Sequence, residues 1–203
     1  MSETRIAVFA SGGGSNFQAI ANACSDGTIP ARVALCVATR PDAGVVERAE
    51  RADIPVHILT DDDSARSQLS VLDEHGIGLV ALAGYMRKVP AAVVSAYRHR
   101  IMNIHPALLP AFGGKGLYGM RVHRAVVEHG VRWSGATVHF VDEDYDTGPI
   151  ILQDVVPVLP GDTPESLAAR VLEVEHRIYP RAVRLFAEGR LRVERRRVFI
   201  EDN

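Results

Sequence analysis

Ile6-Ala7-Val8-Phe9-Ala10 leads directly into Ser11-Gly12-Gly13-Gly14-Ser15-Asn16, and this succession decides the fold. The first five residues are all apolar, which is typical of a strand buried on both faces of a parallel sheet. The three glycines predict a turn, and residues 16–23 predict a helix. A strand that passes through a short turn into a helix is the repeating unit of α/β proteins.

Further strands and helices alternate through the first half of the chain. Apolar runs predict strands at residues 33–38, 56–59, 79–83 and 101–104, and helices are expected between them at residues 45–52, about 64–74 and 90–97. Because a helix joins each strand to the next, the strands are expected to run parallel, with helices on both faces of a doubly wound sheet.

The alternation stops after residue 110. The elements expected beyond it are a helix at residues 122–128, strands at 135–141 and 150–158, a helix from 164 to about 187, and an edge strand at 191–193. The link between the first two strands is too short for a crossover helix, so they should pair antiparallel. Thr163 as N-cap and Pro164 in the first turn favour the long final helix. The predicted fold class is therefore α/β: a doubly wound, mostly parallel, Rossmann-like sheet with an antiparallel C-terminal hairpin and a long C-terminal helix.

Composition narrows the class of protein. The chain has 203 residues, 47% of them hydrophobic, which suits one domain spanning residues 1–203. Its net charge of −2 gives no field that would attract nucleic acid or an anionic membrane. The sequence has no signal peptide and no apolar run of roughly 18 residues, so the expected compartment is the cytoplasm. Cys24 and Cys36 lack a metal-type spacing, and no metal is predicted.

The glycine-rich turn at residues 11–16 predicts an anion site. Backbone N–H groups can approach a phosphate closely there, and the start of the following helix adds positive potential. Phe17 stands where a dinucleotide-binding loop would have its third glycine, and the Lys-Ser/Thr pair of a nucleoside triphosphate loop is missing. A single phosphomonoester therefore fits best, and a flexible turn without a ligand is the alternative.

A second motif, Asn103-Ile104-His105-Pro106, falls at the end of the strand predicted at residues 101–104. Residues two apart in an extended segment point to the same side, and Pro106 favours extended geometry at His105. An amide donor beside a titratable ring suits a carbonyl that becomes an oxyanion. Asn103 would stabilise the charge and His105 would move a proton. The alternative is a turn with a buried, hydrogen-bonded histidine.

Two more motifs follow these in the chain: Ser-Gly-Ala-Thr-Val-His-Phe-Val at residues 134–141 and Asp-Glu-Asp-Tyr-Asp-Thr-Gly-Pro-Ile-Ile at residues 142–151. In this combination the chain resembles the phosphoribosylglycinamide formyltransferases of de novo purine synthesis over residues 5–193. The Asn-x-His and Asp motifs are common to folate-dependent formyltransferases. The glycine-rich turn, the chain length and the Glu-His-x-x-Tyr-Pro segment at residues 175–180 narrow the resemblance to this family.

The resemblance implies a reaction and its catalytic residues. A formyl group would pass from 10-formyltetrahydrofolate to the amine of phosphoribosyl glycinamide, without a covalent enzyme intermediate. Asn103, His105 and Asp146 would be catalytic. A carboxylate near an imidazolium raises the pKa of the ring. Asp146 is therefore expected to help His105 hold a proton.

The resemblance also assigns binding residues. Gly14, Ser15, Asn16 and Glu175 would hold the acceptor, and Arg66, Met86, Arg87, Lys88, Val89 and Asn103 would hold the folate. By the same assignment, residues 1–100 would form a phosphate-binding half and residues 101–203 a catalytic and folate-binding half. Two roles stay open: His139 is explained equally well as structural or catalytic, and residues 112–120 as a mobile lid or a plain insertion.

Three alternatives share parts of this pattern. A formyltetrahydrofolate hydrolase would use the same cofactor, but that family carries an extra N-terminal domain. A methionyl-tRNA formyltransferase would need an additional C-terminal RNA-binding domain. A non-catalytic protein that binds a sugar phosphate or folate could keep the scaffold, although the three catalytic side chains argue against it. The expected partners are small molecules, with no nucleic acid and no membrane, and the chain would be a monomer or a homodimer.

Overall fold

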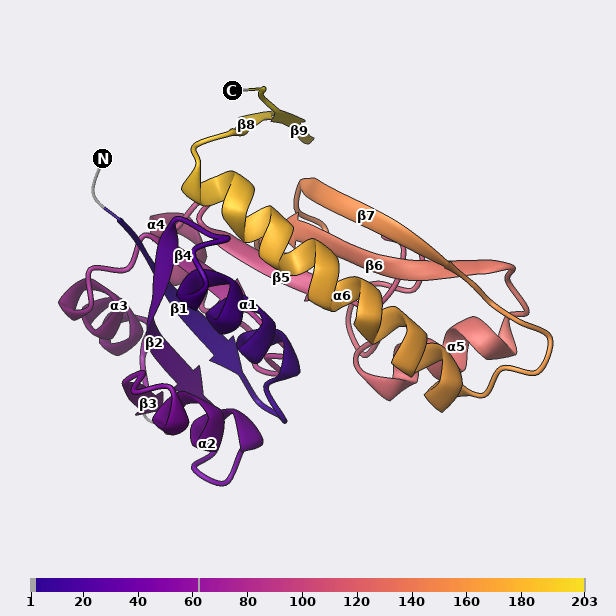
Figure 1. Cartoon of the computed structure of the whole chain (residues 1–203), viewed down its shortest axis with the longest axis horizontal. Helices are drawn as coiled ribbons and strands as arrows, with labels where there is room; N and C mark the ends of the chain where they lie inside the picture. Colours follow the sequence, from indigo (N-terminus) through magenta and orange to yellow (C-terminus); the bar gives the residue numbers. More distant parts are fainter. Residues whose placement is uncertain (1–2, 62, 203) are drawn as a thin grey trace.

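A computed structural model describes residues 3–61 and 63–202; positions 1, 2, 62 and 203, which the expected single domain includes, lie outside the described residues. The described part is built on one nine-stranded sheet with the strand order β3-β2-β1-β4-β5-β6-β7-β9-β8. The sheet begins among the indigo and purple strands and continues to the orange and yellow ones (Figure 1).

Up to β8 the elements follow the chain in the order that the sequence predicts. The strands are β1 (Thr4–Ala10), β2 (Ala31–Ala38), β3 (Val56–Ile58), β4 (Leu79–Leu82), β5 (Ile101–His105), β6 (Trp133–Phe140), β7 (Ile150–Pro157), β8 (Leu191–Glu194) and β9 (Arg197–Ile200). The helices are α1 (Ser15–Ser25), α2 (Gly44–Arg51), α3 (Ala65–Glu74), α4 (Ala91–Ala96), α5 (Met120–Glu128) and α6 (Pro164–Ala187). The predicted α/β class is confirmed.

The first five strands are parallel, as expected. Alternate side chains of β1 enter two different cores. Ile6 and Val8 belong to the core that contains apolar residues of α1, α2, α5 and α6. Ala7 and Phe9 belong to the core that contains residues of α3 and α4. Helices therefore cover both faces of the sheet, which explains why β1 is apolar at every position from Ile6 onward.

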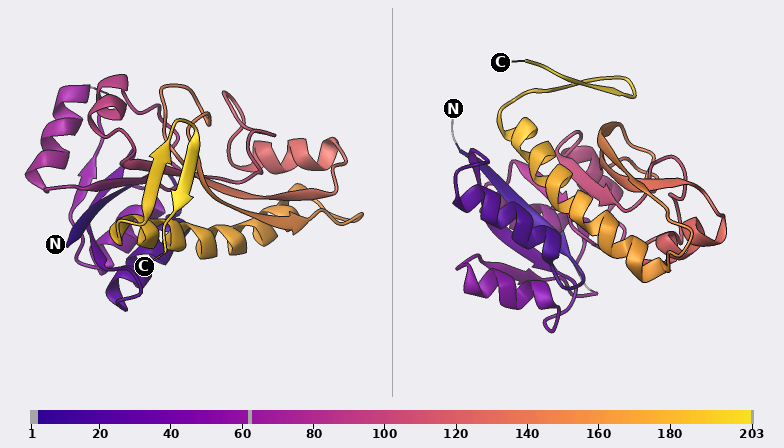
Figure 2. Two further views of the ribbon diagram at one scale, coloured as in Figure 1. Left: turned by 90° about the horizontal axis from the view of Figure 1, so that it is seen from above. Right: turned by 45° about the vertical axis from the view of Figure 1, so that its right-hand side comes forward.

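The second part of the sheet is antiparallel. β6 pairs antiparallel with β5 and with β7, which confirms the predicted C-terminal hairpin. Asn103 lies opposite His139 and His105 lies opposite Thr137 in the β5–β6 register. The long helix α6 packs against β6, β7, α1 and α5, so it spans both parts of the sheet (Figure 2). This register and this helix position the site.

The C-terminus differs from the sequence-based expectation. One edge strand is expected at residues 191–193, whereas β8 and β9 form a hairpin whose second strand lies next to β7. Arginines at residues 195–197 interrupt the apolar pattern and hide the second strand from the sequence. Arg196 donates a hydrogen bond to the carbonyl oxygen of Thr147 at 2.8 Å. The hairpin thereby contacts the loop between β6 and β7.

Helix α6 is fixed at its start and along its length. Thr163 and Ser166 form a reciprocal capping box at its N-terminus. The buried hydroxyl of Tyr179 lies 3.0 Å from the carbonyl oxygen of Leu82 and 3.1 Å from that of Met102, near the ends of β4 and β5. Glu175, one helical turn before Tyr179, is consequently held beside the same strand ends.

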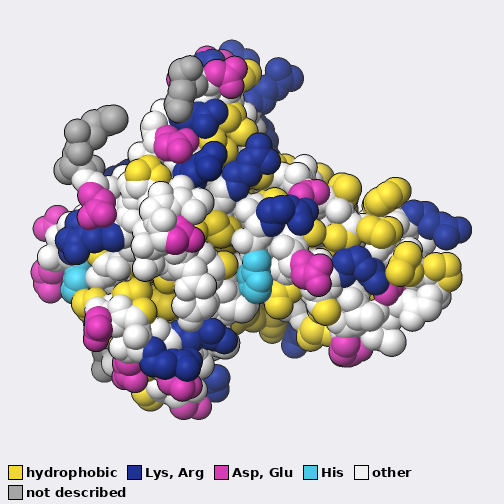
Figure 3. Space-filling model, viewed as in Figure 1, with side chains coloured by type: hydrophobic (Ala, Val, Ile, Leu, Met, Phe, Trp, Pro, Cys, Tyr) yellow, Lys and Arg dark blue, Asp and Glu magenta, His cyan; other side chains and the backbone are white. Residues whose placement is uncertain are grey.

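On the face of the molecule drawn in Figure 3, neither sign of charge covers a large continuous area. Acidic and basic side chains are intermixed over the face drawn in Figure 3, in keeping with the net charge of −2. Within the described ranges, none of the helices combines the length and the apolar character that crossing a bilayer requires.

Candidate active site

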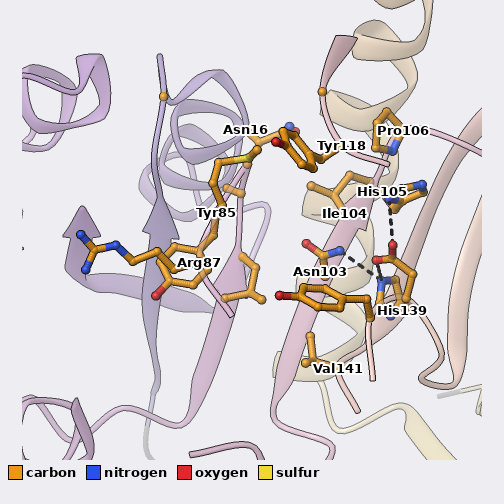
Figure 4. A pocket seen from close by; sticks show the side chains of 18 of the residues that line it. Asn16, Tyr85, Arg87, Asn103, Ile104, His105, Pro106, Tyr118, His139 and Val141 are labelled. Atoms are coloured by element: carbon orange, nitrogen blue, oxygen red, sulfur yellow. Dashed lines mark hydrogen bonds and ion pairs between the residues drawn. The ribbon is translucent and has the colours of Figure 1, made fainter. Parts of the chain in front are cut away.

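A cavity of about 590 Å³ opens at the C-terminal ends of β1, β4 and β5. This edge of a parallel sheet is where ligands bind in open α/β folds. The predicted site residues that line the cavity are Gly14, Ser15, Asn16, Met86, Arg87, Lys88, Val89, Asn103, His105, Asp146 and Glu175. They come from both halves of the chain, and Figure 4 shows Asn103 and His105 on β5 with Asn16 on the other side of the pocket.

Arg66 is the one predicted site residue that does not line the cavity. It is exposed, near the start of α3. The buried residues of α3 include Gln68 and Leu72, one helical turn apart. Arg66 precedes Gln68 by two residues, so it lies on the opposite side of the helix and points to solvent. The structure therefore does not bring Arg66 together with the other predicted site residues.

Asn103 and His105 stand at the end of β5, and both line the cavity, as their spacing predicts. His105 is only 4% exposed. Its Nε2 lies 2.9 Å from the carbonyl oxygen of Phe112. A carbonyl can only accept, so Nε2 carries a hydrogen and donates it. In the neutral ring, Nδ1 is then the basic nitrogen.

Asp146 lies in the loop between β6 and β7 and reaches back to both histidines of the site. Its Oδ2 is 3.6 Å from Nδ1 of His105, and its Oδ1 is 3.6 Å from Nε2 of His139. Its backbone is left-handed, with φ of 58°. Such backbone strain concentrates at functional sites. The contact between Asp146 and His105 that the resemblance implies is thus present in the structure.

His139 orients Asn103. Its Nδ1 donates to the carbonyl oxygen of Phe140 at 2.8 Å, which leaves Nε2 as an acceptor. The side-chain amide nitrogen of Asn103 lies 3.1 Å from that Nε2, so Asn103 donates one N–H to His139. The second N–H of the amide remains for a ligand in the cavity. The sequence leaves the role of His139 open, and the signal that identifies it is its position opposite Asn103 in the sheet.

The protonation states of the central pair follow from burial and neighbours. Burial lowers the pKa of His105; Asp146 and the Phe112 carbonyl oppose this effect, and His139 adds to it. Burial acts to raise the pKa of Asp146, but His139, the charge of His105 and the Gly114 N–H together lower it. At neutral pH the free protein therefore holds an ionised carboxylate beside a neutral imidazole.

This result corrects one expectation. The sequence predicts that Asp146 raises the pKa of His105, and Asp146 does act in that direction. The pKa of His105 is nevertheless lowered. Burial destabilises the imidazolium by more than the negative charge of Asp146 stabilises it. The neutral ring of His105 in the free protein can therefore accept a proton at Nδ1.

His123 is a further cavity residue that the sequence analysis does not single out. It lies on α5, is 5% exposed, and lines the cavity near His105. Burial and the charge of His105 lower its pKa to about 4, so the ring is neutral at pH 7. The helical periodicity of α5 places His123 beside Val122 and Val126 among the buried residues. That periodicity is the only sequence signal for it.

The glycine-rich turn meets α6 at the other end of the cavity. Gly14 has φ of 76°, and a Cβ there would come within 2.8 Å of the side chain of Val45. Only glycine fits this turn without strain. Asn16 donates from Nδ2 to Oε2 of Glu175 at 2.6 Å. Burial raises the pKa of Glu175, and the hydrogen bond from Asn16 opposes the rise.

The loop that follows β4 forms the wall between these two ends. Its backbone is tied to the glycine-rich turn, since the Met86 N–H donates to the hydroxyl oxygen of Ser11 at 3.0 Å. The ammonium group of Lys88 lies 5.5 Å from the ring centre of Tyr145, a cation–π contact across the cavity. Arg87 pairs with the exposed Asp61 at 3.2 Å.

Comparison with known proteins places this arrangement in a family. The family model described as formyl transferase matches residues 4–183. The chain belongs to this family. As a formyl transferase it is 48% identical over 195 residues to the chloroplastic phosphoribosylglycinamide formyltransferase of Arabidopsis thaliana, covering 93% of this chain and 67% of the relative. It is 39% identical over 202 residues to the Escherichia coli phosphoribosylglycinamide formyltransferase, covering 97% and 93%.

Solved structures agree with this assignment. The glycinamide ribonucleotide transformylase 1 of Symbiobacterium toebii superposes on the formyl transferase with a TM-score of 0.93 at 48% identity, covering 98% of this chain and 95% of that one. A formyltetrahydrofolate deformylase from Pseudomonas syringae gives a TM-score of 0.88 at 26% identity, covering 99% and 67%. The predicted membership of the phosphoribosylglycinamide formyltransferase group, and with it the expectation of an enzyme, is confirmed.

Proposed function

We propose that this formyl transferase transfers the formyl group of 10-formyltetrahydrofolate to the amine of phosphoribosyl glycinamide. The observation that carries the proposal is a single cavity with two chemically distinct ends. A glycine-rich turn suited to a phosphate lies at one end. Asn103, His105 and Asp146 meet at the other. A substrate with a phosphate and a reacting amine could span them.

The acceptor would lie between the turn and α6. Gly14, Ser15 and Asn16 would hold the phosphate through backbone N–H groups and the start of α1. Glu175, whose carboxyl is fixed by Asn16, would accept hydrogen bonds from the glycinamide portion. Asn16 would thus contact the phosphate and also hold Glu175, the residue that would bind the glycinamide portion.

The donor would occupy the wall after β4. Backbone groups of residues 86–89 offer hydrogen bonds to a flat, polar ring such as a pterin. Arg87 and Lys88 lie in the same lining and could meet the carboxylates of a folate. Asn103 would contact the formyl oxygen. Arg66 has no part in this proposal, because its side chain points to solvent.

The transfer needs a proton acceptor that becomes a proton donor. The neutral amine attacks the formyl carbon, a C–N bond forms, and the carbonyl π electrons move to oxygen. The free N–H of Asn103 stabilises that oxyanion. Nδ1 of neutral His105 takes the proton that the new ammonium releases, and Asp146 stabilises the resulting imidazolium. The proton then passes to the folate nitrogen as the bond from carbon to that nitrogen breaks.

The formyl transferase is tested by a spectrophotometric assay with 10-formyltetrahydrofolate, run with and without phosphoribosyl glycinamide. Release of folate that depends on the acceptor is expected. Release without the acceptor would replace the proposal by a hydrolase, a candidate that the similarity to the deformylase keeps in view. If no folate is released in either assay, the chain would instead be a non-catalytic binding protein.

The domain organisation, compartment and oligomeric state of the enzyme are also proposals. We expect a single domain that acts in the cytoplasm on small molecules, as a monomer or a homodimer. Two plant relatives carry the word chloroplastic in their names, and the chain spans 67% and 62% of their lengths. Fractionation of the source cells and sedimentation of the purified chain would test compartment and oligomeric state.

A further inference from the structure

The segment at residues 112–114 crosses behind the catalytic pair and bonds to both members through its main chain. The carbonyl oxygen of Phe112 accepts a hydrogen bond from Nε2 of His105 at 2.9 Å. Two residues later, the N–H of Gly114 donates to Oδ2 of Asp146 at 2.8 Å. One short stretch of backbone therefore fixes an imidazole from β5 and a carboxylate from the β6–β7 loop.

Residue 113, between these two bonds, has little room for a side chain. A Cβ there would overlap the Cδ2 methyl of Leu109 and come within 3.3 Å of the Cβ of Asp146. Phe112 and Gly114, on either side, have φ of 54° and 97°. Left-handed backbone at a non-glycine residue such as Phe112 is strained and persists where the surroundings hold it.

The side chain of Phe112 supplies such surroundings. Its ring meets the ring of His129 edge to face, with centroids 5.3 Å apart and an angle of 84° between the planes. His129 is the C-cap of α5, so the strained residue is anchored to a helix that packs against α6. The segment is thus held from outside the cavity, and its polar main-chain groups face inward.

We propose that the main chain of residues 112–114 is a positioning clamp, which selects the Nε2–H form of His105 and holds Nδ1 toward Asp146. The inference rests on the proposed function, because Nδ1 is the nitrogen that moves the proton there. It makes Gly113 a positioning residue, since a Cβ there would press on Asp146 from 3.3 Å. The groups that face His105 are Asp146 from the loop, His139 from β6 and His123 from α5.

The first test is nitrogen NMR of the full chain labelled at histidine, without ligand, at neutral pH. The clamp requires that His105 be protonated at Nε2 and bare at Nδ1, identified by comparison with His105→Ala. The opposite tautomer would overturn the proposal. This experiment does not depend on turnover, so it stands even if the wild-type chain fails to transfer a formyl group.

The second test replaces Gly113 by alanine. A displacement of about 1 Å at reacting groups can cost about 100-fold in rate, so we expect kcat to fall by about 10-fold to 100-fold while KM for both substrates stays within about threefold. Losing the Phe112 carbonyl would lower the pKa of His105, because that contact raises it. The acid limb of the kcat/KM profile should consequently move to lower pH.

Gly161→Ala is the matched control, because a Cβ at Gly161 meets nothing within 4 Å. It should leave kcat and the pH profile unchanged. An unaltered kcat in Gly113→Ala would overturn the clamp. So would a loss confined to KM. If Gly113→Ala lowers Tm, the NMR tautomer measured on the folded wild-type chain still decides the question.

Discussion

The two ends of the cavity are assembled from the chain by different routes. At the acceptor end, residues 11–16 are consecutive, and one strand, one turn and one helix create their geometry. At the catalytic end, Asn103 is far in the sequence from His139 and Asp146. They meet because β5 and β6 pair antiparallel with Asn103 opposite His139.

Because the two ends are assembled differently, different substitutions are expected to disrupt each of them. A local turn depends on its own residues, chiefly on glycine at a position that has no room for a Cβ. A site that depends on strand register is exposed to changes elsewhere, since a shift of one residue turns every side chain to the other face. Substitutions can therefore separate binding at one end from chemistry at the other.

The largest effect is expected from His105→Ala. Losing a positioned proton acceptor costs about 10²-fold to 10⁴-fold in kcat. The acceptor end should be unaffected, so binding of phosphoribosyl glycinamide measured by calorimetry should keep its Kd. His75→Gln, at the C-cap of α3 and outside the cavity, is the control. Turnover near wild type in His105→Ala would remove His105 from the mechanism.

A second effect concerns His123, which is buried and neutral at the catalytic end. Its pKa is about 4 in the folded chain against 6.5 in the unfolded chain. Between these pH values the unfolded chain binds the proton and the folded chain does not. The free energy of unfolding therefore falls as pH drops from 6.5 toward 4, by an upper bound of about 3 kcal/mol from this group.

His123→Phe should reduce that pH dependence, as measured by urea unfolding at pH 7 and at pH 4.5. His105 contributes a slope of the same sign, because its pKa is also lowered. The relevant quantity is thus the difference between wild type and variant. Equal slopes in the two proteins would show that His123 is not buried as a neutral ring.

A third effect is expected at the acceptor end from Gly14→Ala. Left-handed backbone at a non-glycine residue costs about 1 to 3 kcal/mol, and the new Cβ would also press on Val45. The free energy of unfolding should fall by about this amount, and KM for the acceptor should rise while KM for the donor stays constant. Gly12→Ala, where a Cβ meets nothing within 4 Å, is the steric comparison. An equal rise in both KM values would contradict the division of the cavity.

The smallest effect is expected from Arg196→Ala. Arg196 is exposed, and its one hydrogen bond supports the Thr147 carbonyl next to Asp146. Loss of a single exposed hydrogen bond should lower the free energy of unfolding by less than about 1 kcal/mol. The loop carries Asp146, so kcat should fall slightly, by no more than about threefold, while acceptor binding is unchanged. A larger loss of kcat would mean that the C-terminal hairpin holds the catalytic loop in place.

Much of the site could be predicted because its signals are local. The spacing of Asn103 and His105 follows from the two-residue period of a strand. The turn at residues 11–16 follows from its glycines. The position of Arg66 outside the cavity could not be predicted, because it depends on which face of α3 is buried, and residues near a helix start give little information about that face.

The sequence by itself determined the α/β class, the order of the elements and the residue types at both ends of the cavity, because these depend on periodicity and on local backbone preferences. Only the tertiary structure decided the pairing of His139 with Asn103, the burial that lowers the pKa of His105, and the contact of residues 112–114 with both catalytic side chains. Each of these depends on strand register or on exclusion of water, which arise when distant segments pack together.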